Sequence, residues 1–98
     1  MAYKLIILPK AKLDIKEASV WYAERQFELD KRFIASVKET TGIIKSNPFL
    51  FEIRYDNVRT ALLDTFPYLI HFTIYTDVIV IKAVYHTSRN SEIWKNRN

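Results

Sequence analysis

Cysteine is absent from this 98-residue chain, glycine occurs once and proline three times. Without cysteine the chain forms no disulfide and offers no thiolate to a metal ion. The single glycine, Gly42, excludes a glycine-rich loop of the kind that cradles phosphate groups. The two histidines and the carboxylates stand at no recognised metal-ligand spacing, so the sequence predicts neither a metal nor a cofactor.

Long apolar runs are also missing. The N-terminal run Leu5–Leu8 stops at Pro9, whereas a signal peptide needs a longer apolar region and a small-residue cleavage site. No stretch approaches the roughly 20 apolar residues that span a bilayer. The sequence therefore predicts a soluble, cytoplasmic protein without a membrane partner.

What the chain does contain is enough apolar material for one packed core. Apolar residues make up 49% and aromatic residues 14%, which argues against disorder. The length suits a single domain over residues 1–98. The 15 Lys and Arg against 11 Asp and Glu give a net charge of +4, spread evenly along the chain. This balance favours acidic partners in general and does not single out nucleic acid.

The first half of the chain predicts a strand and two helices. The β-forming residues Tyr3–Leu8 favour a strand, and apolar residues at helical spacing predict a helix over residues 10–25. A second helix is expected from Glu28 to Lys45, where Asn47–Pro48 stops it. The short connection predicts an antiparallel hairpin. Gly42, inside the second helix, either admits a close neighbour or weakens the helix.

The second half predicts three strands, Val58–Leu63, Tyr68–Tyr75 and Val78–Tyr85, each rich in β-branched and aromatic residues. A two-residue turn at Thr76–Asp77 fixes the register of the last two strands, although it lacks the glycine usual in such turns. The predicted cross-strand pairs are Ile74 with Ile79, Phe72 with Ile81, Ile70 with Ala83 and Tyr68 with Tyr85. These eight residues form an apolar face for the helices to cover.

The opposite face of this predicted sheet is mixed rather than polar, so something should cover it. Either the C-terminal segment with Ile93 and Trp94 or a partner protein would do so, and both can apply. The face comprises Leu69, His71, Thr73, Tyr75, Val78, Val80, Lys82, Val84 and His86.

Three groups of residues follow one another at separations typical of a known superfamily. The hairpin group is Leu13-Asp14-Ile15, Glu17-Ala18, Trp21-Tyr22, Arg32-Phe33, Val37 and Asn47-Pro48. The central-strand group is Val58-Arg59 and Phe66-Pro67-Tyr68 with Ile70 and Phe72. The third group, in the last strand and the C-terminal segment, is Ile81, Ala83-Val84-Tyr85-His86, Arg89 and Trp94. From about residue 3 to residue 95, the chain resembles RelE/ParE superfamily toxins, the toxic half of type II toxin–antitoxin pairs.

The resemblance implies an α+β fold, β-α-α-β-β-β, with a mainly antiparallel sheet packed on a helical hairpin and a short C-terminal helix. It also implies a cognate antitoxin as partner, whose initially disordered helical segment wraps the toxin. ParE-type members bind and poison DNA gyrase without chemistry of their own. RelE-type members cleave messenger RNA on the ribosome.

For a metal-independent nuclease, the candidate residues are Arg59, His86, Arg89 and Glu52, because RNA cleavage needs cations for the phosphorane, a base and an acid. RelE-type nucleases, however, carry an arginine where this chain has Leu69, and leucine cannot stabilise phosphate charge. We therefore favour a ParE-like inhibitor of gyrase. A ribosome-dependent mRNA endoribonuclease is the alternative, and a decayed copy that only sequesters an antitoxin is a third possibility.

The candidates for contact with the antitoxin or the target lie on the helix-free face. Arg59 would join that face beside His71 and Lys82 if Val58, Thr60 and Leu62 point inward. The full set of binding candidates is Leu69, His71, Val80, Lys82, Val84 and Trp94.

Overall fold

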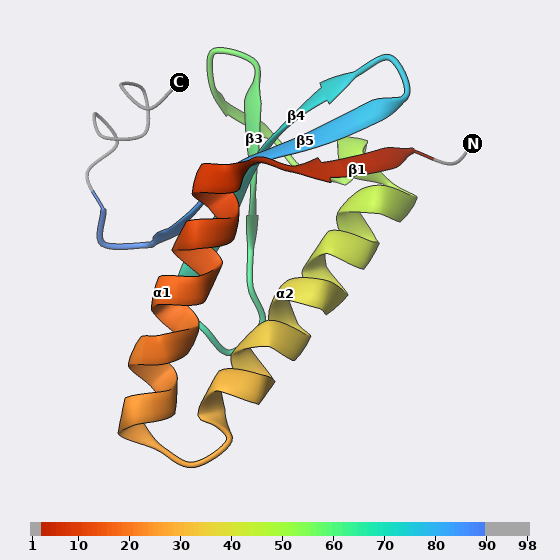
Figure 1. Ribbon diagram of the computed structural model, residues 1–98. Coiled ribbons are helices and arrows are strands. Elements are labelled where there is room, and N and C mark those ends of the chain that lie inside the picture. The colour runs from red at the N-terminus through yellow and green to blue at the C-terminus, as the bar shows by residue number, and fades with distance from the viewer. Residues whose placement is uncertain (1–2, 90–98) are drawn as a thin grey trace.

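The computed structural model describes residues 3–89, which form a five-stranded sheet with a helical hairpin on one face (Figure 1). The elements are β1 (Lys4–Ile7), α1 (Pro9–Arg25), α2 (Leu29–Ser46), the 3₁₀ turn η1 (Pro48–Leu50), β2 (Ile53–Tyr55), β3 (Val58–Leu62), β4 (Tyr68–Tyr75) and β5 (Val78–His86). The predicted α+β class is confirmed. The short strand β2 was not predicted, and the expected C-terminal helix, with Ile93 and Trp94, lies outside the described residues.

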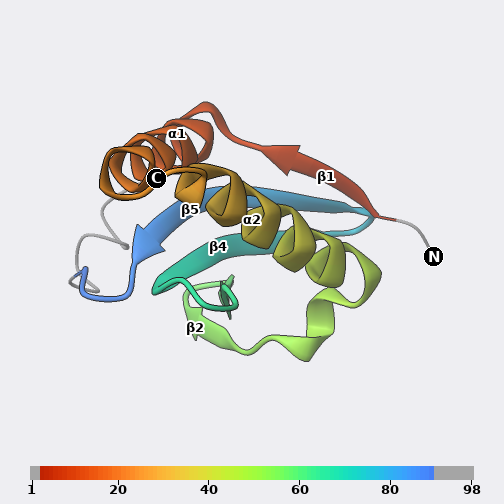
Figure 2. The ribbon, with the colours of Figure 1, turned by 90° about the horizontal axis from the view of Figure 1, so that it is seen from below.

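The strands lie in the order β1-β5-β4-β3-β2. All neighbours are antiparallel except β1, which runs parallel to β5, so the first strand lies beside the last. Both helices cover the same face of β4 and β5 (Figure 2). Among the helices of residues 3–89, none has the length and apolar character of a membrane span.

The core lies between the helical hairpin and this face of the sheet. Helical periodicity directs one stripe of side chains on each helix inward. The aromatic rings of the core, those of Tyr22, Phe33, Phe66 and Tyr68, meet mostly edge to face, the arrangement that aromatic pairs favour. The helices contribute Ala11, Ala18, Tyr22, Phe33, Val37 and Ile44, and the strands contribute Ile70, Phe72, Ile79 and Ile81.

The register of β4 and β5 agrees with the prediction in its first half only. The two-residue turn at Thr76–Asp77 and the pairs Ile74–Ile79 and Phe72–Ile81 are confirmed. Beyond them the predicted pairs are wrong, because a β-bulge places one extra residue, Lys82, in β5. The observed pairs are His71 with Ala83, Ile70 with Val84, Leu69 with Tyr85 and Tyr68 with His86.

The bulge exchanges the two faces at the end of β5, because side chains alternate along a strand. Val84 joins the core on the helix side, whereas Ala83 and Tyr85 form a small cluster on the far face. The expectation that Val84 and His86 face away from the helices is therefore wrong. This exchange carries His86 to the helix side of the sheet.

Gly42 lies in α2, and a Cβ atom added there would meet nothing within 4 Å. Of the two roles considered for this glycine, close approach of a neighbour is thus wrong. We expect Gly42→Ala to raise the free energy of unfolding by about 1 kcal/mol, since alanine restricts the unfolded chain and favours the helix. Unfolding of the two chains in urea would measure this difference in free energy.

A reciprocal variant, Ala35→Gly, provides the control, because Ala35 is an exposed position in the same helix. Ala35→Gly should lower the free energy of unfolding by a similar amount, about 1 kcal/mol. An unchanged or lower stability in Gly42→Ala would contradict this account.

Candidate functional site

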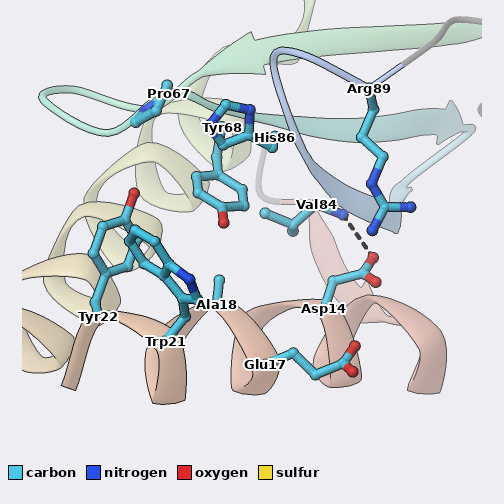
Figure 3. Close-up of a pocket in the computed structure, with 10 residues that line it drawn as sticks. All are labelled: Asp14, Glu17, Ala18, Trp21, Tyr22, Pro67, Tyr68, Val84, His86 and Arg89. Atoms are coloured by element: carbon cyan, nitrogen blue, oxygen red, sulfur yellow. Dashed lines mark hydrogen bonds between the residues drawn. The ribbon is translucent and has the colours of Figure 1, made fainter. Parts of the chain in front are cut away.

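A pocket of about 540 Å³ opens between α1 and the end of the sheet where β4 starts and β5 stops (Figure 3). We call it the α1–β5 pocket. Trp21, Tyr22 and Tyr68 supply aromatic walls. The charged and polar lining comes from Asp14 and Glu17 on α1, together with His86 and Arg89. It combines aromatic surface with charges of both signs, a composition suited to binding.

The two tyrosines of the pocket pack edge to face, with 6.2 Å between the ring centroids of Tyr22 and Tyr68. Burial raises the pKa of both phenols above the ordinary value of 10.0. At Tyr68 the neighbouring Tyr22 raises the pKa further, while Arg89 opposes the rise. Both rings therefore remain neutral hydrogen-bonding groups at physiological pH.

These raised pKa values predict a loss of stability in alkali. The unfolded chain releases the phenolic protons first, so stability that is fully present below pH 10 declines as pH rises above that value. The free energy of unfolding, measured between pH 8 and 11, should fall less steeply in Tyr68→Phe than in the parent chain. Identical slopes would contradict the assignment to Tyr68.

Asp14 connects α1 to the edge of β5. Its Oδ2 atom accepts a hydrogen bond from the backbone N–H of Val84 at 3.0 Å. Strand β1 pairs with β5 only as far as Ile81, so the carboxylate takes over the role of a neighbouring strand beyond that point. Figure 3 shows the side chain of Arg89 pointing toward Asp14.

The ring of His86 is engaged by Ser88, two residues further along the chain. The Nδ1 atom accepts the backbone N–H of Ser88 at 3.0 Å and lies 2.8 Å from the Ser88 hydroxyl. A neutral ring with Nδ1 as acceptor carries its proton on Nε2, a tautomer assigned here from the hydrogen bond. In this tautomer the lone pair of Nδ1 is the one that Ser88 engages.

Arg59 lies away from this pocket and on the face opposite to the one expected. It pairs with Phe72, whose side chain is in the core, while Thr60 takes the place opposite His71. Its Nη1 atom donates to the carbonyl oxygen of Phe51 at 2.6 Å, and its guanidinium lies 5.1 Å from the ring centre of Phe49. Arg59 thus fixes the connection between α2 and β2.

The structure brings two of the four candidate nuclease residues together. His86 and Arg89 share the α1–β5 pocket. Glu52 is exposed, immediately before β2, close to Arg59 in the chain. Arg59 on β3 pairs with Phe72 of β4, and His86 on β5 pairs with Tyr68 of β4. Phe72 and Tyr68 are four residues apart, so Arg59 and His86 are separated by about 13 Å along the strands and by about 10 Å across them. His86 and Arg89 on the one hand, and Glu52 and Arg59 on the other, therefore do not share one phosphate-sized site.

The helix-free face carries most of the binding candidates. His71 is buried there rather than at the surface, with its Nδ1 atom 3.1 Å from the Tyr55 hydroxyl and its ring 5.2 Å from that of Tyr85. It pairs with Ala83 and not with Lys82, as a consequence of the bulge. Leu69, Val80 and Lys82 are partly exposed, whereas Val84 lines the α1–β5 pocket. Trp94 lies outside the described residues.

Sequence reasoning missed the half of the pocket that α1 supplies. Asp14, Glu17 and Trp21 follow one another at intervals of three and four residues, which places them on one side of a helix. This spacing could have indicated a shared helix surface, but the sequence analysis used these residues only to recognise the helical hairpin. Within residues 3–89, no three His, Cys, Asp or Glu side chains come close enough to hold a metal ion.

Comparisons with known proteins agree with this architecture. Residues 5–91 match the family described as the ParE toxin of the type II toxin–antitoxin system, parDE. No curated protein matches. Among solved structures, a chain from the chromosomal ParDE TA system of P. aeruginosa superposes with a TM-score of 0.72 at 15% identity, over 87% of this chain and 96% of that chain. At this identity the superposition supports the fold alone. The family match spans most of the sequence, and the chain therefore belongs to the ParE toxins of type II toxin–antitoxin systems.

Proposed function

We propose that this toxin arrests growth by binding DNA gyrase, and that a cognate antitoxin neutralises it by binding the toxin. The match to the ParE family over residues 5–91 carries the proposal. In the solved ParDE relative, toxin and antitoxin are named as one system. Inhibition by binding needs complementary surfaces and no aligned acid and base.

The arrangement of the candidate nuclease residues supports binding over RNA cleavage. Arg59 is engaged by the Phe51 carbonyl, and Nδ1 of His86 is engaged by the backbone N–H of Ser88. Leu69 occupies the position at which RelE-type nucleases carry an arginine. Without a cation at this position, the stabilisation of the transition state for RNA cleavage would be weaker by about 3 kcal/mol.

A supercoiling assay with purified gyrase tests the target. We expect the purified chain to inhibit supercoiling in proportion to its concentration, and added antitoxin to restore it. His86→Gln should inhibit as strongly as the parent chain, because a binding inhibitor needs no proton transfer. A parallel translation reaction with ribosomes and mRNA provides the comparison. Cleaved mRNA together with unaffected supercoiling would overturn the proposal in favour of a nuclease.

We further propose that Val80 and Lys82, both partly exposed on the helix-free side of β5, belong to the surface that the antitoxin contacts. A charge at position 80 would then be buried without a partner on binding. Titration calorimetry with Val80→Asp should show weaker antitoxin binding than the parent chain. Unchanged affinity in a folded variant would remove this face from the interface.

A further inference from the structure

The outer edge of β5 pairs with another strand along only part of its length. Strand β1 runs parallel to β5 and its register ends at Ile81. The last contact of this pair is the N–H of Leu8, which donates to the C=O of Ile81 at 3.0 Å. The chain then leaves the sheet and begins α1. The rest of the edge, at Val84 and His86, therefore lines the α1–β5 pocket and not a strand.

Two backbone groups of this edge point away from β4. Successive residues of a strand direct their N–H and C=O groups to alternate sides. The N–H of Thr87 donates to the C=O of Pro67, immediately before β4, at 2.8 Å, so the backbone groups of His86 and Val84 point to the outer side. The N–H of Val84 donates to Asp14 of α1 accordingly. Within residues 3–89, the C=O of Val84 and the N–H of His86 form no hydrogen bond.

This acceptor and this donor have the spacing that a parallel strand uses. In a parallel pair, one residue donates its N–H to a C=O of its neighbour and accepts the N–H two residues further on. Ile6 of β1 has this relation to β5. The C=O of Val84 and the N–H of His86 offer the same pair of bonds to one residue of an extended chain. An antiparallel residue opposite Val84 would also need its N–H, which Asp14 already accepts.

We propose that an extended segment of a partner protein docks in the α1–β5 pocket, parallel to β5, and places a lysine or arginine side chain there. The residue bonded to Val84 and His86 lies level with Tyr85, whose side chain is on the far face. The next residue lies level with His86 and therefore directs its side chain to the helix side, into the pocket. The docking site goes beyond the proposed inhibition of gyrase and does not depend on it.

The lining contributed by α1 favours a long basic side chain. Figure 3 shows Trp21 and Glu17 on either side of Ala18, which is small and leaves room above it. The ring of Trp21 suits a cation, since the guanidinium of Arg25 already lies 4.1 Å from its centre. Within residues 3–89, Glu17 takes part in no ion pair. A basic side chain can lay its aliphatic stem on the aromatic wall and bring its charge to Glu17.

The cation of the pocket itself is directed elsewhere. The side chain of Arg89 points toward Asp14 (Figure 3), and its guanidinium lies 5.2 Å from the ring centre of Tyr85. The carboxylate of Asp14 in turn accepts the N–H of Val84. The charge that the pocket offers to a ligand is therefore the carboxylate of Glu17.

Nuclear magnetic resonance of the isotope-labelled chain tests the proposal with a short probe, the peptide Ser-Val-Lys-Thr with acetyl and amide caps. Two backbone hydrogen bonds and one side chain support weak binding, with a dissociation constant of about 1 mM. The amide signal of His86 should shift more than that of Val84, because only the His86 amide gains a partner. The same peptide with N-methylvaline lacks the donor to the C=O of Val84 and should bind roughly ten-fold more weakly.

A second comparison tests the basic side chain. Glu17→Gln should bind the lysine peptide about three-fold more weakly, the effect of losing an exposed ion pair. It should bind a peptide with uncharged norleucine in place of lysine as well as the parent chain does. Glu24→Gln makes the same change at an exposed position of α1 outside the pocket, and should leave the binding of both peptides unchanged.

Several results would overturn the proposal. One is an unshifted His86 amide at millimolar peptide, and another is equal binding of the N-methylated peptide. A third is a loss of affinity in Glu17→Gln that is the same for the lysine and norleucine peptides. Shifts of the His86 amide that depend on protein concentration without any peptide would assign the pocket to a second copy of the chain instead.

Discussion

Phe33→Ala is expected to cost about 3–5 kcal/mol of unfolding free energy, the usual range for removing a large buried aromatic side chain. Phe33 is fully buried, and its ring lies 5.3 Å from that of Tyr22, 5.3 Å from Phe66 and 5.2 Å from Tyr68. It thereby joins both helices to the start of β4. A domain of this size has about 5–15 kcal/mol in total, so the variant should be close to unfolding.

Chemical denaturation monitored by circular dichroism would measure this loss. Phe27→Ala is the matched control, because it removes the same atoms from a side chain that is 89% exposed. It should change stability by less than about 0.5 kcal/mol. Similar effects in the two variants would show that Phe33 does not organise the core as described.

Asp14→Ala is expected to cost about 1.5–3 kcal/mol, the range for a hydrogen bond to a charged group. The substitution removes the oxygen that accepts the partly buried N–H of Val84 and leaves that donor without a strand to replace it. Asp14→Asn keeps an acceptor oxygen and should lose less. Thermal and urea unfolding of the three chains would rank them.

Glu17→Ala controls for the change in charge, since Glu17 lies nearly one turn further along α1 and is exposed. We expect it to stay within about 0.5 kcal/mol of the parent chain. Hydrogen exchange offers a local test, because the amide of Val84 should lose protection in Asp14→Ala. Equal protection in the two chains would mean that another group supports this end of β5.

The helical hairpin was predictable because several local signals agreed. Apolar residues recurred at helical spacing, Pro9 suited a first turn, and Asn47–Pro48 ended the second helix. Strand β2 was missed because it has three residues and follows no alternating pattern. Its turn to β3 depends on Asp56 with φ 48°, a conformation that aspartate adopts more readily than most residues.

The bulge in β5 could not be predicted from the sequence. The position of Val84 and His86 on the helix side of the sheet depends on this bulge, so it could not be predicted either. From Ile81 to Tyr85 the strand is apolar at both alternating positions once Lys82 is left out, so either face satisfies the hydrophobic pattern. His86 and Arg89, both named as candidates from the sequence, line the same pocket. The sequence could not tell which helix they would face, because that depends on the one extra residue.

The parallel pairing of β1 with β5 has a consequence for folding during synthesis. Lys4 pairs with Val78 and Ile7 with Ile81, so contacts at one edge of the sheet join residues more than 70 positions apart. Such long-range pairing slows folding, because the chain must close a large loop before the contact forms. While the ribosome adds residues at about 5–20 per second, the helical hairpin is available early, but β1 has no neighbour until β5 emerges. A nascent toxin should therefore acquire its final surface only late in translation, which leaves an antitoxin present in the cell time to meet it as soon as it folds.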